Sequence, residues 1–93
     1  MTNDELKRKI ADVVLDEDEL DHIIVLEGDE FADGAIGLTI DNNLVYSYEK
    51  LIDSLTEVYG SETDAIDWLE YNTIRSLSYM GSYGNEPIII HEL

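Results

Sequence analysis

The chain of 93 residues has no cysteine, one proline and only five lysine or arginine residues. Without cysteine it can form no disulfide bond, thiolate nucleophile or cysteine-ligated metal site. So few cations argue against direct binding to nucleic acid, because domains that bind it neutralise phosphates with lysine and arginine. No apolar run approaches the roughly 20 residues that span a bilayer, and the first residues do not form a signal peptide. We therefore expect a soluble, cytoplasmic protein that binds neither nucleic acid nor membrane.

Acidic residues are abundant: there are 22 Asp and Glu, and the formal net charge is −17. Hydrophobic residues still make up 44% of the chain, which predicts a folded protein and not an acidic disordered tail. The length predicts a single domain, residues 1–93. A domain of this size is about 30 Å across, and 30 Å of duplex DNA carries roughly 18 phosphates. The charge therefore suits either mimicry of DNA or plain solubility.

The acidic residues are concentrated between Asp16 and Asp33, where nine carboxylates occur without a cation. A dense negative surface accelerates the encounter with a basic partner and makes the affinity sensitive to salt. The residues predicted to contact such a partner are Asp16, Glu17, Asp18, Glu19, Asp21, Asp29 and Glu30.

The first helix is predicted from Thr2 to about Leu15. Thr2 and Glu5 have the spacing of a capping box, and apolar residues recur with a helical period after them. The helix is expected to end there because residues 16–19 are a run of like charges. Residues 22–26 are short, branched and apolar, which predicts a strand.

A hairpin is predicted next. Residues 35–40 alternate, so Ile36, Leu38 and Ile40 are expected to share one buried face. Residues 41–43 form the turn and residues 44–46 the returning strand.

Two further helices follow the hairpin in this interpretation. Ser47 caps the first, Gly60 ends it, and Ser61 caps the second. Residues 87–91 form a final strand, which is expected either to pair centrally or to pair with a second copy of the chain. The predicted class is α+β, a small and mostly antiparallel sheet of three to four strands with two to three helices packed on one face.

No catalytic motif is present. The acidic segment fails the test for an EF-hand loop, because Ile40 stands where a bidentate Glu is required. The two histidines, His22 and His91, fall at strand ends, and no Gly-x-Ser-x-Gly or phosphate-binding loop occurs. We expect no enzyme activity, no metal ion and no cofactor.

The most specific segment runs from Tyr71 to Tyr79. On a helix, Tyr71, Asn72, Arg75 and Tyr79 lie on adjoining rows. These residue types are common at binding hot spots, which makes the segment a candidate recognition patch. The alternative is a structural pin, in which Asn72 and Arg75 hold the helix to the loop at residues 81–87.

At these residues the chain resembles a small protein family of gut bacteria (Firmicutes-type) and their phages. The shared pattern comprises residues 33–37, 45–50, 64–68, the Tyr-Asn-Thr-Ile-Arg segment at 71–75, and residues 87–89. The resemblance implies a shared fold and a phage or mobile-element setting, within the host cytoplasm if a phage encodes the protein. It assigns no catalytic residues.

Two functions follow from these observations. The first is a non-enzymatic phage accessory protein that binds a basic, nucleic-acid-binding host protein through a DNA-mimicking surface, as an inhibitor of the anti-restriction or anti-CRISPR type. The alternative is a structural or regulatory protein-interaction module, including a homodimer, in which the acidic residues serve only solubility.

Overall fold

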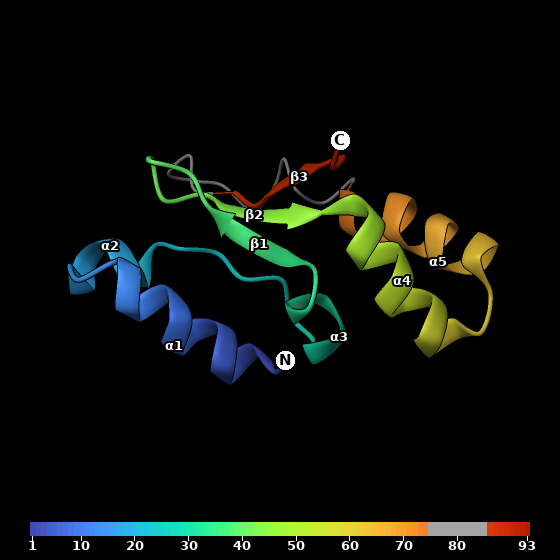
Figure 1. Ribbon diagram of the computed structural model, residues 1–93, viewed down its shortest axis with the longest axis horizontal. Helices are drawn as coiled ribbons and strands as arrows, with labels where there is room; N and C mark the ends of the chain where they lie inside the picture. Colours follow the sequence, from blue (N-terminus) through green and yellow to red (C-terminus); the bar gives the residue numbers. More distant parts are fainter. Residues whose placement is uncertain (75–85) are drawn as a thin grey trace.

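The computed structural model of the protein describes residues 1–74 and 86–93. Its elements are arranged as an α+β fold with a three-stranded mixed sheet, which confirms the predicted class (Figure 1). In chain order they are α1 (Asn3–Val13), α2 (Glu17–Asp21), α3 (Asp29–Ala32), β1 (Ala35–Leu38), β2 (Leu44–Ser47), α4 (Tyr48–Tyr59), α5 (Glu62–Trp68), the π-helix η1 (Leu69–Ile74) and β3 (Ile88–Ile90).

The strand order is β1-β2-β3, with β2 in the centre. The hairpin strands β1 and β2 are antiparallel, whereas β2 and β3 are parallel, with Val45 opposite Ile88. The helices α4, α5 and η1 lie between β2 and β3 in the chain. They form the crossover connection that two parallel strands require, because the chain must return to the same end of the sheet before β3 begins. The final strand is therefore at an edge of the sheet, not in its centre, because the hairpin already occupies the other side of β2.

Three serine or threonine caps and one glycine set the helix ends as predicted. Thr2, Ser47 and Ser61 accept backbone N–H bonds from residues three positions later, at the starts of α1, α4 and α5. Gly60 ends α4 with a φ of 78°, in the left-handed region that glycine adopts without strain.

The acidic stretch is more helical than the sequence suggested. The first helix ends at Val13, but Asp16 then caps the short helix α2, and its Oδ1 accepts from the backbone N of Asp18 at 2.9 Å. A third short helix, α3, follows at Asp29–Ala32 and also has acidic residues in its first turn. The positive end of the helix dipole attracts carboxylates in the first turn, and this attraction offsets the repulsion between them.

The strand predicted at residues 22–26 is wrong. This segment contains no strand, although Ile23 and Val25 pack against the core and Leu26 is buried. The backbone N of Leu26 donates to the hydroxyl of Tyr46 at 3.0 Å. In a strand, this N–H would donate to a backbone carbonyl of the neighbouring strand instead. Leu26 is thus buried, and the apolar residues 23–25 half-buried, without strand pairing.

The predicted burial of one face of β1 is also wrong. Ile36 is 39% exposed and Ile40 is fully exposed, while Leu38 is half-buried. The pairing register shifts between Ala35 and Gly37, so Ile36 is an extra residue in a β-bulge. Ile40 lies beyond the end of the strand.

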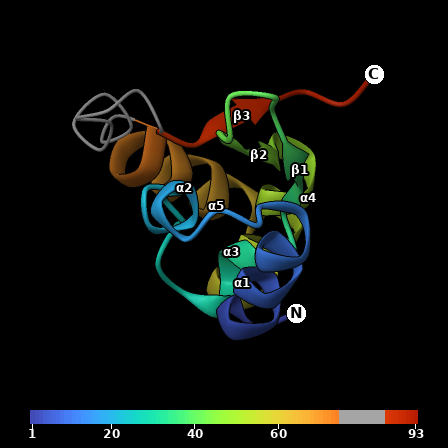
Figure 2. The same cartoon turned by 90° about the vertical axis from the view of Figure 1, so that its left-hand side faces the viewer.

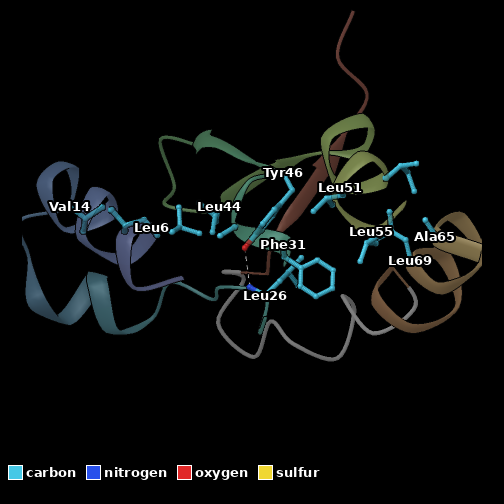
Figure 3. Packing of buried hydrophobic residues seen from close by; sticks show 13 residues of the cluster. Leu6, Val14, Leu26, Phe31, Leu44, Tyr46, Leu51, Leu55, Ala65 and Leu69 are labelled. Carbon is cyan, nitrogen blue, oxygen red and sulfur yellow. Dashed lines mark hydrogen bonds between the residues drawn. The ribbon is translucent and has the colours of Figure 1, made fainter. Parts of the chain in front are cut away.

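The core extends along the whole molecule, which measures 40 × 25 × 25 Å (Figure 3). Tyr46 and Leu44 of the central strand lie at its middle, α1 supplies one end and α4 with α5 the other. The helices lie on one side of the sheet (Figures 1 and 2). The acidic helix α2 therefore lies at one end of the molecule, and α4 with α5 at the other.

Candidate acidic interaction surface

The seven predicted contact residues form two groups at opposite ends of α1. The α2 group, defined here as Asp16, Glu17, Asp18, Glu19 and Asp21, lies beyond the C-terminal end of α1. The other two, Asp29 and Glu30, begin α3 beside the N-terminal end. A helix of 11 residues is about 16 Å long, so the structure does not bring the two groups together.

The α2 group is presented to solvent. All five of its carboxylates are exposed on or next to a helix that buries no residue completely. Glu19 accepts from the side-chain amide of Asn42 at 3.2 Å, which ties α2 to the turn of the hairpin. Asn42 has a φ of 67°, in the region that asparagine tolerates better than most residues. The group is therefore held in place at one end of the molecule.

Carboxylates at both ends of α3 make structural contacts with the start of the chain. Asp29 Oδ1 accepts from the backbone N of Asn3 at 2.8 Å, and the Asn3 side chain donates to the carbonyl of Leu26 at 3.0 Å. Asp33 bonds the Met1 ammonium at 2.5 Å, and this hydrogen bond raises the pKa of that ammonium above its ordinary value. Asp29 thus stabilises the start of α1, and Glu30 is half-buried. The structural role of Asp33 was not predicted from the sequence.

Almost all of the negative charge is at the surface. Of the 22 carboxylates, 20 are exposed and two, Glu30 and Glu86, are half-buried. Among the described residues, the ion pairs to amines are Met1 with Asp33 and Lys50 with Glu92, the latter at 3.9 Å. Within residues 1–74 and 86–93, most carboxylates are therefore not engaged in ion pairs with amines.

The density of this charge is close to that of duplex DNA. The 20 exposed carboxylates along a 40 Å axis give one for about every 2 Å, and the net charge of −17 gives one for about every 2.4 Å, whereas duplex DNA carries one charge for about every 1.7 Å. The charge is spread over the helices and is not confined to the stretch from Asp16 to Asp33. The exposed carboxylates of α4 and α5 are Glu49, Asp53, Glu57, Glu62, Asp64 and Asp67.

The Tyr71–Tyr79 segment is only partly described. Tyr71 and Asn72 are exposed on η1, and the Asn72 side chain donates to the carbonyl of Trp68 at 3.1 Å, within the same helical run. Arg75 and Tyr79 lie outside the described residues. The buried Asn43 donates from its side chain to the carbonyl of Glu86 at 3.0 Å, just before the last strand.

Sequence reasoning missed a small cluster at the start of α4. Glu49 contacts His91 Nδ1 at 2.7 Å and accepts from the backbone N of Glu92 at 2.7 Å. The ring of His91 also lies against Tyr48, with 4.8 Å between centroids. Hydrogen bonds from His91 and then from Glu92 lower the pKa of Glu49. The partners are 42 residues apart, so no local spacing could have indicated the contact.

Residues 1–74 and 86–93 contain neither a cluster of metal ligands nor a membrane-spanning helix. Within these ranges no three His, Asp or Glu side chains gather as the ligands of a metal ion would. No helix there has the length and apolarity to cross a bilayer. No protein-family model, curated protein or solved structure matches the chain.

Proposed function

We propose that this chain is a non-enzymatic binding protein whose carboxylates occupy a basic site that another protein uses for nucleic acid. The observation that carries the proposal is the charge density, one exposed carboxylate for about every 2 Å of a 40 Å body. A basic channel that neutralises DNA phosphates at about 1.7 Å spacing is complementary to such a body.

The α2 group is the preferred centre of this contact. Its carboxylates are exposed; Asp16 bonds within α2 itself, and Glu19 accepts from the side chain of Asn42 in the hairpin turn. Asp29, by contrast, stabilises the start of α1. Carboxylates that are free to meet lysine and arginine contribute to steering and affinity without cost to the fold.

In its finer form the proposal is an inhibitor encoded by a phage or mobile element, whose target is a restriction or CRISPR-type effector. The resemblance of residues 34–90 to a family of gut bacteria and their phages supports this setting. Such effectors hold nucleic acid in positively charged channels. Occupation of the channel by this chain would exclude the nucleic acid directly.

The test is affinity capture of the tagged protein from bacterial lysate at low and moderate salt, with excess duplex DNA in half of the samples. A single basic nucleic-acid-binding protein, recovered at low salt and displaced by DNA, is the expected result. A partner that resists DNA, or recovery of no partner, would contradict the proposal.

Two matched variants then locate the contact on the captured partner. The first carries Asp16→Asn, Glu17→Gln, Asp18→Asn, Glu19→Gln and Asp21→Asn. The second neutralises five exposed carboxylates of α4 and α5, at Asp53, Glu57, Glu62, Asp64 and Asp67. Both lose five negative charges, so they share the same net charge. We expect the first to weaken binding by at least about tenfold more than the second. Equal losses would show that only bulk charge matters and would remove the α2 group from the proposal.

A further inference from the structure

A pocket of about 360 Å³ lies between the irregular residues 24–27 and the end of the helical crossover. The side chains that give it chemical character are Glu27, Phe31, Trp68, Asn72 and Thr73. Its volume is within the range of pockets that bind small ligands. Part of its wall belongs to η1, and π-helical turns are rare and often occur at functional sites. The pocket is therefore a candidate binding site apart from the α2 group.

The aromatic wall of the pocket is held in place by ring contacts. The ring of Trp68 is stacked with Tyr59, with 5.7 Å between centroids, and tilted against Phe31, with 5.6 Å between centroids. Phe31 is buried and Trp68 is half-buried. An apolar surface that is formed before a ligand arrives loses little conformational entropy when the ligand binds.

The polar side chains at the pocket offer acceptors. The side-chain amide of Asn72 donates to the carbonyl of Trp68 at 3.1 Å, which leaves its Oδ1 to accept from a ligand. Glu27 is exposed, and its carboxylate has no ion pair among the described residues. None of the described residues that line the pocket is a lysine or arginine. The site thus combines a negative charge with an apolar wall.

The charges that flank the lining residues in the sequence are negative as well. Asp29 and Glu30 follow the irregular segment, and Asp67 lies next to the aromatic wall in α5. The three consecutive cations, residues 7–9, are on α1 and do not line the pocket. Lys50 is paired with a carboxylate of the C-terminal segment. The field around the pocket therefore attracts a cation and repels an anion.

We propose that this pocket receives an arginine side chain of the basic partner. The choice of partner rests on the proposed function, and the pocket adds the residue type that the partner presents. The apolar stem of an arginine packs against Phe31 and Trp68, while its guanidinium donates to the Glu27 carboxylate and to Asn72 Oδ1. Lysine suits the site less, because its compact ammonium is more strongly hydrated and has no planar face to lay on a ring.

Trp68 is the single tryptophan of the chain, so it reports on the pocket without a label. The probe is the blocked peptide acetyl-Gly-Arg-Gly-amide, titrated into the full chain while the indole fluorescence and the indole N–H resonance are recorded. We expect a saturable change, and binding at least about tenfold weaker when lysine or norleucine replaces the arginine. Equal responses to the three peptides, or no saturable response to arginine, would overturn the inference.

Matched variants test the carboxylate. Glu27→Gln removes the charge at the pocket, and Glu57→Gln removes an exposed charge from α4, so the two variants have the same net charge. We expect Glu27→Gln to weaken binding of the arginine peptide by at least about fivefold and Glu57→Gln to leave it unchanged. Equal losses would show that bulk charge attracts the peptide and would overturn the assignment of Glu27.

The chain's own Arg75, which lies outside the described residues, is the competing occupant. The arginine peptide should bind the parent chain and an Arg75→Ala variant equally well. Binding to the Arg75→Ala variant alone would overturn the inference and assign the pocket to the arginine of this chain.

The peptide titrations contain no partner protein, so their outcome is separate from that of the affinity capture. Peptide binding without a captured partner would leave the arginine pocket and remove the proposed function. Capture of a DNA-displaced partner without peptide binding would leave the proposed function and remove the arginine pocket.

Discussion

The hydroxyl of Tyr46 joins two segments that no strand pairing connects. Tyr46 is fully buried in the central strand and accepts a hydrogen bond at 3.0 Å from the backbone N of Leu26, in the irregular segment at residues 22–26 (Figure 3). Burial raises the pKa of Tyr46, although the bond from Leu26 acts in the opposite direction. One side chain thus satisfies a buried backbone donor that would otherwise need a neighbouring strand.

The variant Tyr46→Phe should destabilise the protein by about 1–3 kcal/mol, because it leaves the Leu26 N–H buried without an acceptor. Urea unfolding measures the change, and Tyr59→Phe, at a residue that is 41% exposed, is the control. A Tyr46→Phe protein as stable as the control would contradict the role of this bond.

The same variant should alter the dependence of stability on pH. The folded state holds the Tyr46 proton to a higher pH than the unfolded state does, so stability falls as pH rises above the ordinary tyrosine pKa of about 10. The fall should be smaller for Tyr46→Phe than for the parent protein.

At the scale of the element, helix boundaries were more predictable than strands. The caps at Thr2, Ser47 and Ser61 are local, since each side chain bonds a backbone three residues away. Strand pairing is not local, so residues 22–26 had a strand-like composition but no strand as partner. The bulge at Ile36 depends on the register with β2, which composition does not encode.

Gly60 provides a clean test of one boundary. It ends α4 in the left-handed region, and a Cβ added there would meet no atom within 4 Å. The variant Gly60→Ala should therefore cost about 1 kcal/mol through backbone strain alone. Thermal or urea unfolding measures the loss, and Gly60→Asn should lose less because asparagine tolerates this conformation. A loss for Gly60→Asn as large as that for Gly60→Ala would contradict the explanation.

At the scale of the whole molecule, the sequence predicted how much charge there is but not how it is distributed. The seven candidate residues are close in sequence, yet α1 separates them into two groups. The contact of Glu49 with His91 and the bond from Asn43 to Glu86 join residues more than 40 positions apart. Such contacts follow from the crossover between β2 and β3, which local patterns do not determine.

Surface charge of one sign also limits stability. Repulsion among the exposed carboxylates opposes the compact state more than the extended one. The melting temperature should therefore rise from low to high sodium chloride, where the screening length falls below the spacing of distant charges. Differential scanning calorimetry measures this shift. A melting temperature that falls with salt would show that attractive ion pairs dominate.

The parallel pairing of β2 with β3 has a kinetic consequence. Val45 and Ile88 are 43 residues apart, so their contact closes the longest loop in the sheet, whereas the β1–β2 hairpin closes a short one. Contacts between distant residues incur their entropic cost before they stabilise the chain, and such pairings form late. We expect β3 to add to a preformed hairpin and helix pair, so that interactions at its isoleucines slow unfolding more than they accelerate folding.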